Sequence, residues 1–186
     1  MADDPVVTTP TDFNVGSGVK AVRKLLMTYV DVSETSTASW ELIGSGVEDS
    51  SIELNPNTET VTDILGITET AVTKWEASQS FEPYTVKGGS KLAFKLHEIW
   101  RQKTPEQLSK FTVLLVYAYI GDETNGYYAE KQTDCTINIT SIGGSAYVDM
   151  PIELSLSNKT TTGTVTFSQG APTFAADATE NDTEET

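Results

Sequence analysis

The chain has 186 residues and a mass of 20.1 kDa, which fits one domain with extensions at its ends. It is 38% hydrophobic, so it can bury a core, and 27 acidic against 12 basic residues give a net charge of −15. That acidity excludes a nucleic-acid binder that relies on cationic side chains. A single cysteine and a single histidine exclude internal disulfides, cysteine-based zinc clusters and two-histidine metal sites. We expect no metal, no cofactor and no enzymatic activity, and a structural or binding role instead.

The two ends differ in composition from the middle of the chain. Residues 1–24 contain few large apolar groups and predict an N-terminal arm, whereas residues 25–169 carry the strand signals of a β domain. Residues 170–186 predict an acidic, flexible C-terminal tail, because five acids and no base follow Phe174.

The apolar runs are too short for a membrane helix. The longest, Val113–Ile120, falls well short of the roughly 20 residues that such a helix needs. Asp3 and Asp4 stand near the start, where a signal peptide carries basic residues. We therefore expect no membrane insertion, and a protein made in a cytoplasm and kept or assembled there.

Strand signals dominate between residues 25 and 169, where threonine, valine and isoleucine recur and apolar residues alternate with polar ones. Val113–Ile120 is apolar at every position, which predicts a central strand covered on both faces. Asn125-Gly126 and Gly143-Gly144 are tight-turn signals. The predicted strands are Leu25–Val32, Ser39–Ile43, Ser51–Leu54, Thr60–Leu65, Ala71–Trp75, Gln79–Tyr84, Val113–Ile120, Thr133–Ile142, Tyr147–Ser157 and Gly163–Phe167.

Two of these strands alternate clearly enough to assign faces. One face of the first takes Cys135, Ile137 and Ile139, and the inward face of the second takes Val148, Met150, Ile152, Leu154 and Leu156.

One helix is predicted at about 90–104. Ser90 is a good N-cap, and Pro105 prevents the helix from continuing smoothly. An apolar stripe at i, i+4, i+7 and i+8 consists of Leu92, Leu96, Ile99 and Trp100. The fold class is therefore mainly β: a sandwich or barrel with one flanking α-helix and extended arms or a hairpin.

Three features could suggest chemistry, and each has a simpler interpretation. His97 lies off the apolar stripe with no evident nucleophile, which favours a surface or interface histidine. Cys135 points to the apolar face of its strand and is adjacent to Asp134, which favours a core cysteine over a reactive thiolate. Residues 121–126 lack the ligand spacing of a calcium loop and predict a hairpin turn.

The charge is segregated along the chain. Residues 25–73 hold nine acids and no base, and residues 74–110 hold seven bases and four acids. The successive nets for 1–24, 25–73, 74–110 and 111–186 are 0, −9, +3 and −9. The pattern fits a solvated surface, or it fits acidic and basic faces of identical subunits that meet in an oligomer.

A polar segment within the acidic block predicts a hairpin tip. Its residues are Asn55, Pro56, Asn57, Thr58, Glu59 and Thr60. It is an ordinary tip, or it belongs to an extended acidic hairpin that contacts a neighbouring copy. For the second case the candidate partners are the basic residues Lys87, Lys91 and Lys95 of that copy.

An ordered series of segments resembles a known family. The segments are Leu26–Ser33, Trp40–Val47, Leu54–Glu59, Phe81–Tyr84, Val116–Tyr119, Tyr128–Gln132 and Ile142–Gly144. From about Leu25 to Phe167 the chain is similar to the major tail tube proteins of long-tailed, siphovirus-type bacteriophages, especially those of Gram-positive hosts.

The resemblance implies a β-sandwich or barrel subunit that forms hexameric rings, stacked into a hollow tube through which the genome leaves the capsid. It implies contacts with itself and with other tail proteins, namely tape measure, terminator and distal tail proteins, in a virion assembled in the host cytoplasm. DNA would be a passing cargo, because carboxylates facing the lumen repel phosphates.

Two alternatives remain open. The first is the inner tube of a contractile tail or tailocin, which the sequence does not separate from a siphovirus tube. The second is a β-sandwich adhesion or carbohydrate-binding module. Dispersed Trp40, Trp75 and Trp100, and the lack of a secretion signal, disfavour the second.

Overall fold

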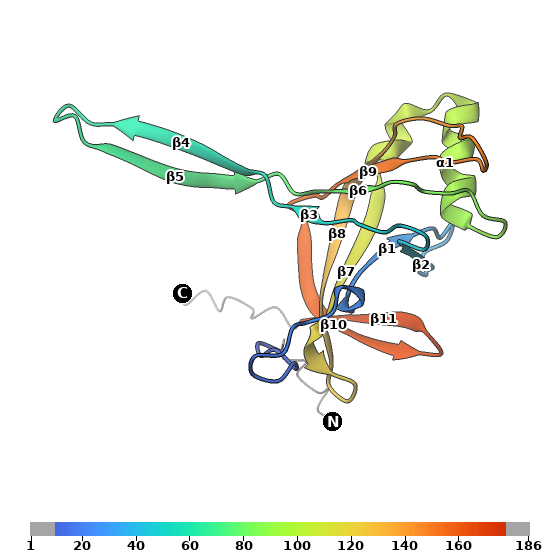
Figure 1. The fold of residues 1–186 in the computed structure, drawn as a ribbon, viewed down its shortest axis with the longest axis horizontal. Coiled ribbons are helices and arrows are strands. Elements are labelled where there is room, and N and C mark those ends of the chain that lie inside the picture. Colours follow the sequence, from blue (N-terminus) through green and yellow to red (C-terminus); the bar gives the residue numbers. More distant parts are fainter. Residues whose placement is uncertain (1–9, 178–186) are drawn as a thin grey trace, which may run out of the picture. The chain divides into compact units, whose positions relative to one another are not determined.

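The computed structural model describes residues 10–177, which form strands, one α-helix and two short 3₁₀ turns (Figure 1). The strands are β1 (Leu26–Asp31), β2 (Trp40–Ile43), β3 (Ile52–Glu53), β4 (Pro56–Thr62), β5 (Thr68–Trp75), β6 (Ser78–Phe81), β7 (Phe111–Asp122), β8 (Gly126–Ile139), β9 (Ile152–Ser155), β10 (Thr160–Ser168) and β11 (Ala171–Ala176). The helix is α1 (Lys91–Gln102), and the 3₁₀ turns are η1 (Arg23–Leu25) and η2 (Pro105–Ser109). The prediction of a mainly β chain with one helix is confirmed.

Within residues 10–177 the strands form one nine-stranded sheet and one separate hairpin. The order in the large sheet is β2-β1-β7-β8-β9-β6-β3, with β10 paired to β8 and β11 paired to β10. The hairpin consists of β4 and β5 alone. The chain divides into two compact units, and β1, β7 and β8 contribute residues to both.

Unit 2 comprises residues 30–113 and 132–159 and contains α1 and the β4–β5 hairpin. Here β6 pairs with β9 from Ser78↔Ser155 to Phe81↔Ile152, and β9 pairs with the end of β8. Its core includes Phe81, Phe111 and Leu96, which are almost completely buried.

Unit 1 comprises residues 1–29, 114–131 and 160–186, of which 10–29, 114–131 and 160–177 are described. Strand β10 pairs with β11 through a two-residue turn in which Gln169 and Gly170 both have positive φ, of 50° and 84°. Such a turn matches the right-handed twist of the strands that it joins.

The chain ends were predicted as an arm and a tail. In the first, Phe13 forms a bridge with Ile120, and Asn14 Nδ2 donates to the carbonyls of Ala118 and Gly121 at 3.0 and 2.7 Å. In the second, β11 is an ordered strand beyond the expected boundary at residue 169. The remainder of both predictions, residues 1–9 and 178–186, lies outside the described residues.

The helix begins and ends close to its predicted limits. Ser90 is the N-cap and its side chain accepts a hydrogen bond from Ala93 N, while Lys103 ends the helix in a left-handed conformation. Leu92, Leu96 and Ile99 are buried as predicted.

The placement of Trp100 on the buried stripe was wrong. Its side chain is 56% exposed, and Lys103 Nζ lies 3.1 Å from the centroid of its ring. Ala93 is buried instead, because the core-facing side of α1 follows positions 92, 93, 96 and 99.

The structure bears on two further strand predictions, at Val113–Ile120 and at Val148. Val113–Val116 is buried at every position, so the prediction of a strand covered on both faces holds for that stretch. Val148, expected to point inward, is 55% exposed. Around it the chain forms isolated bridges rather than a continuous strand: Asp149 pairs with both Thr85 and Gly143, and β9 begins only after Pro151.

Candidate self-association surfaces

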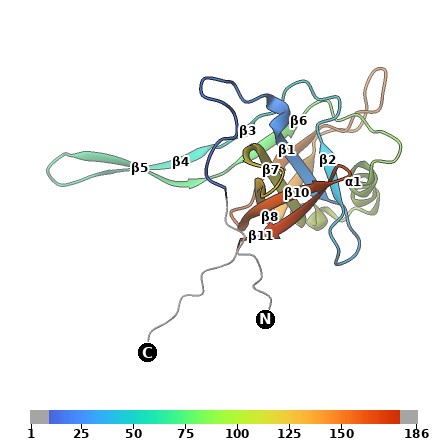
Figure 2. The same ribbon diagram turned by 90° about the horizontal axis from the view of Figure 1, so that it is seen from below.

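The β4–β5 hairpin is exposed along its whole length. Every residue of both strands is exposed, and within the described chain the two strands pair only with each other. Figures 1 and 2 show the ribbon extending away from α1 in both views. An isolated two-stranded ribbon is marginally stable in water. A partner that covers it would add the burial that its own unit does not supply.

The predicted position of the hairpin turn was wrong. The turn lies at residues 63–67, where Asp63 Oδ1 accepts hydrogen bonds from the amides of Leu65 and Ile67, each at 2.8 Å. Gly66 has a φ of 80°, a conformation that glycine adopts without cost. An aspartate that accepts bonds from amides two and four residues later is ordinary turn chemistry, and it fixes the tip here.

Asn55–Thr60 therefore lies at the base of the hairpin and along its first strand. Asn55 has a φ of 41°, and its Nδ2 donates to Glu76 O at 3.2 Å and to Ser78 Oγ at 3.1 Å. Lys74 forms an ion pair with Glu76, which lowers the pKa of that carboxyl. These contacts tie the two strands together where they leave the sheet.

The two faces of the hairpin carry different side chains. Directly paired residues share a face. One face carries Thr58, Thr60, Thr62, Thr68, Thr70 and Val72, and the other carries Glu59, Val61, Glu69 and Ala71. On the threonine face, the hydroxyls of Thr60 and Thr70 lie 3.1 Å apart, as do those of Thr62 and Thr68. The opposite face is acidic.

The tip itself is apolar. Ile64 is 103% exposed, Leu65 is 79% exposed and Ile67 is 58% exposed. The polar segment Asn55–Thr60 predicted a polar tip, and this prediction was wrong. Three adjacent aliphatic side chains at the end of an exposed ribbon are typical of an interaction site.

The candidate basic partners occupy two different places in unit 2. Lys87 Nζ donates to Ser45 O at 3.0 Å and to Ser45 Oγ at 2.8 Å, so it is engaged within its own subunit. Lys91 is exposed on the first turn of α1, and Lys95 is half-buried one turn later, 5.3 Å from the centroid of the Phe111 ring. Lys91 and Lys95 share one surface, whereas Lys87 lies on another loop.

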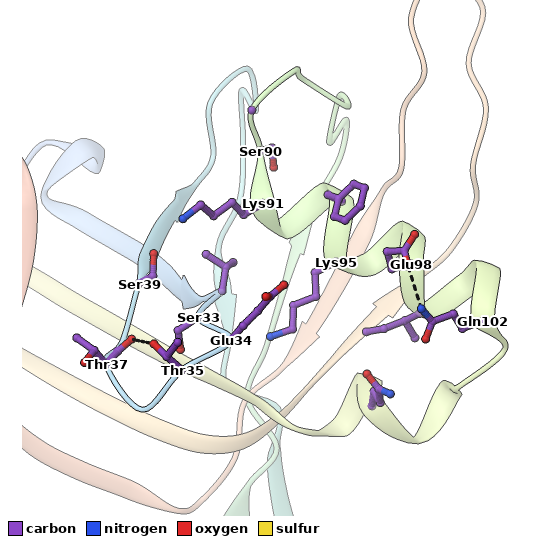
Figure 3. A pocket seen from close by; sticks show the side chains of 15 residues that line it. Ser33, Glu34, Thr35, Thr37, Ser39, Ser90, Lys91, Lys95, Glu98 and Gln102 are labelled. Carbon is purple, nitrogen blue, oxygen red and sulfur yellow. Dashed lines mark hydrogen bonds between the residues drawn. The ribbon is translucent and has the colours of Figure 1, made fainter.

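A groove runs between α1 and the loop formed by residues 33–39, and it encloses about 880 Å³. Asp31 Oδ1 accepts the amides of Ser33 and Ser39, each at 2.9 Å, and so closes this loop. Figure 3 shows Glu34 from the loop and Lys95 from the helix extending into the space between them.

The helix side of the groove combines apolar and charged groups. Phe94 is 66% exposed, while Ile99 is buried. Glu98 also lines the groove, and it accepts hydrogen bonds from Arg101 Nε and from Gln102 Nε2, both at 2.9 Å. The contact with Arg101 lowers the pKa of the Glu98 carboxyl. Because Glu98 is paired with Arg101, the charge that remains on the helix side of the groove is basic.

The large sheet also ends in unpaired strands. In the described chain, β2 and β3 stand at the two ends of the strand order, and β11 pairs on one side only, with β10. Leu42 of β2 is about half exposed. Unpaired strand edges are templates for pairing with another chain, so these edges are a second kind of candidate interface.

Unit 1 contains a tyrosine–carboxylate cluster. Glu130 accepts hydrogen bonds from Tyr117 Oη at 3.2 Å and from Tyr128 Oη at 2.7 Å, and the two rings lie 5.3 Å apart. Burial, and then the charge of Glu130, raise the pKa of Tyr117. Burial, and then the hydrogen bond to Glu130 and its charge, raise the pKa of Tyr128. Glu130 joins β7 to β8 through these bonds, which is a structural role.

The residues considered for chemistry have ordinary surroundings. His97 is exposed on α1, and Cys135 is fully buried, with its thiol pKa raised by burial. The prediction of a core cysteine is confirmed. At residues 121–126 the predicted turn is also confirmed: Asp122 Oδ1 accepts the amides of Thr124 and Asn125, each at 2.7 Å.

The described part of the chain contains no group of three or more histidine, cysteine, aspartate or glutamate side chains placed to hold a metal ion. Among residues 10–177, no helix is long and apolar enough to cross a membrane.

Sequence reasoning missed the apolar tip and the groove. A signal for the tip was present, since Asp63 and Gly66 stand between two threonine-rich alternating runs. The groove had no comparable signal, because the loop at 33–39 and the helix are separated by about 50 residues of chain.

No protein-family model matches the chain, and no curated protein matches it. Among solved structures, the chain is similar to a component of the PVC sheath–tube complex of an extracellular contractile injection system in its extended state. The identity is 13%, the TM-score is 0.46, and the match covers 75% of this chain and 88% of that one.

Two further solved structures are similar. One is from the sheath/tube terminator of the same PVC system, with 10% identity, a TM-score of 0.49 and coverage of 79% and 99% of the two chains. The other is the tube-terminating cap of the anti-feeding prophage, with 10% identity, a TM-score of 0.44 and coverage of 81% and 95%.

Proposed function

We propose that this chain is the structural subunit of a phage tail tube, in which hexameric rings stack into the conduit for the genome. The proposal extends to a siphovirus-type tail, to residence in the virion and to contacts with other tail proteins. It is supported by the ordered series of segments between about Leu25 and Phe167 that resembles the major tail tube family.

The observation that carries the proposal is the hairpin. All residues of β4 and β5 are exposed, and their tip presents three exposed aliphatic side chains. A ribbon of this kind gains little from its own unit and much from a neighbour that covers it. Repeated in every copy, such a contact builds an assembly, because each copy offers both the hairpin and the surface that receives it.

The charge of the chain is consistent with a conduit. A net charge of −15 means that the surface repels phosphates on balance. A tube wall of that sign keeps DNA mobile instead of binding it, whereas a basic wall would retain it through counterion release.

The interface candidates keep their proposed role in ring contacts. Along the hairpin they are Asn55, Pro56, Asn57, Thr58, Glu59 and Thr60, and on the facing copy they are Lys87, Lys91 and Lys95. Opposite charges fix register and speed association, and salt weakens them.

The test is assembly with and without the hairpin. Residues 57–74 are replaced by Asn-Gly, which joins the directly paired Pro56 and Trp75 through a tight turn. We expect unchanged circular dichroism in the far ultraviolet apart from the lost hairpin, and loss of long tubes by negative-stain electron microscopy. The unaltered chain should form rings and tubes as its concentration rises.

Two results would overturn the proposal. One is an unaltered chain that stays strictly monomeric in analytical ultracentrifugation at high concentration, with no rings or tubes in micrographs. The other is a hairpin-deleted chain that still forms long, straight tubes, which would remove the hairpin from the assembly.

A further inference from the structure

We infer that the apolar tip of the hairpin seats in the groove between α1 and the 33–39 loop of a second copy of the chain. This inference rests on the proposed function, since it names the surface that receives the hairpin. The tip consists of Ile64, Leu65 and Ile67, and the groove is the one in Figure 3.

The occupant has to come from another copy. The hairpin and the groove belong to the same unit, and the ribbon extends away from α1 in both views (Figures 1 and 2). Strand β4 has seven residues. At about 3.3 Å per residue the tip lies roughly 20 Å from the hairpin base, so it cannot fold back onto its own α1 without breaking the strand pairing.

The groove has the size and the apolar surface that the tip requires. Its volume of about 880 Å³ accommodates two or three aliphatic side chains. Its exposed apolar surface is contributed by the aromatic ring of Phe94, next to Val32 and Ile99, which line the groove but are buried. Burying Leu65 and Ile64 there would remove from water apolar surface on both partners.

The charges flanking the two surfaces are complementary. Asp63 and Glu69 border the tip, and from Pro56 to Thr73 the hairpin contains no basic residue. Lys91 and Lys95 line the groove. Glu34 and Glu98 line it as well, but Glu98 is engaged by Arg101 at the edge of the helix, which leaves the helix side basic.

Cross-linking tests the contact between the hairpin tip and the groove directly. Leu65→Cys is combined in one chain with a cysteine in the groove, at Thr35, Phe94 or Gln102 in turn, while the buried Cys135 is left unchanged. Because each copy then carries one cysteine on the tip and one in the groove, mild oxidation of assembled material should give a ladder of oligomers on a non-reducing gel. A disulfide requires Cα atoms within about 7 Å, so three groove positions are scanned.

The matched control pairs Leu65→Cys with Thr124→Cys, an exposed position in the turn between β7 and β8. It should give dimers through the tips at most. Two results would overturn the contact between tip and groove: assembled tubes that give no ladder from any groove position, or an equal ladder from the Thr124 control. Either result would leave the tube proposal standing. A chain that never assembles would overturn both.

A charge exchange gives a second, independent readout. Glu69→Lys, or Lys91→Glu with Lys95→Glu, should each raise the concentration needed for assembly by about tenfold or more. Combining all three substitutions should restore most of the loss, as expected for groups that face one another. Lys110→Glu, an exposed residue outside the groove, is the control. Failure of the combination to restore assembly would overturn the pairing of these charges.

Discussion

Glu41 and Ser90 are joined by a hydrogen bond of 2.5 Å that fixes the start of α1 against β2. Ser90 Oγ donates to Glu41 Oε1, and Glu41 Oε2 accepts the amides of Lys91 and Leu92, each at 2.9 Å. Ser90 Oγ in turn accepts the amide of Ala93 at 3.1 Å. Three of the four amides that a helix leaves without a partner in its first turn are therefore satisfied, two of them by a carboxylate 50 residues away.

Glu41→Ala should destabilise the fold by about 1–3 kcal/mol, since the variant loses charge-assisted bonds to two helix amides. Glu41→Gln should cost less, because the amide oxygen still accepts while the charge facing the positive helix end is lost. Urea denaturation followed by circular dichroism measures both. Glu48→Ala, an exposed acid nearby in the chain, serves as the control and should change stability little. An equal loss in the control would contradict a specific role for Glu41.

Leu96→Ala should destabilise the fold by about 2–5 kcal/mol, because the side chain is completely buried and its removal leaves a cavity. Trp100→Ala and His97→Ala should each cost far less, since both residues are exposed on the same helix. Thermal melts of the three variants give the ranking. A loss for Trp100→Ala that matches Leu96→Ala would mean that a partner covers the tryptophan.

Cys135 should be inert in the folded protein. Its side chain is fully buried, and burial raises the pKa of its thiol, so little thiolate is present or accessible at neutral pH. A thiol reagent such as a maleimide should label the chain only after denaturant is added. An exposed cysteine introduced by Thr124→Cys should label at once under native conditions, which makes it the positive control. Rapid labelling of the unaltered native chain would contradict the buried placement.

Stability should fall in alkaline solution through Tyr117. Burial, and then the charge of Glu130, raise its pKa above the ordinary value of 10.0. The unfolded chain therefore releases this proton at a pH where the folded chain retains it. The contribution of Tyr117 to the free energy of unfolding is fully present below about pH 10. It is lost as pH rises from there toward the raised pKa, by up to about 1.4 kcal/mol per pH unit.

The measurement is urea denaturation at a series of pH values from 8 to about 11.5. Tyr117→Phe removes the titrating group and should flatten the decline above about pH 10. Tyr147→Phe, which alters an exposed tyrosine, should leave the decline unchanged. An identical pH profile for Tyr117→Phe and the unaltered chain would remove Tyr117 as a cause.

Local patterns in the sequence predicted part of the secondary structure correctly. Ser90, the spacing of Leu92, Leu96 and Ile99, and Pro105 predicted α1 within a few residues, because caps and helical periodicity act within one or two turns. The apolar run at Val113–Val116 similarly predicted a buried strand, and alternation placed Cys135 on a buried face. These features depend on neighbours in the chain, so the chain alone reveals them.

The tertiary structure decided where these elements expose their surfaces. Both Asn55–Thr60 and Asp63–Ile67 carry turn-forming residues, and only the register between β4 and β5 selects the second as the tip. Trp100 lies outside the core because the orientation of α1 buries Ala93 instead.

The groove could not be predicted from the sequence. Sequence patterns predicted a mainly β, acidic chain with one amphipathic helix and segregated charge. Only the fold brings Glu34 on a loop to the same cavity as Lys91 and Lys95 on a helix, and only the fold leaves the hairpin tip exposed. The physical reason is that burial and juxtaposition are set by contacts between residues distant in sequence, which no local pattern of side chains encodes.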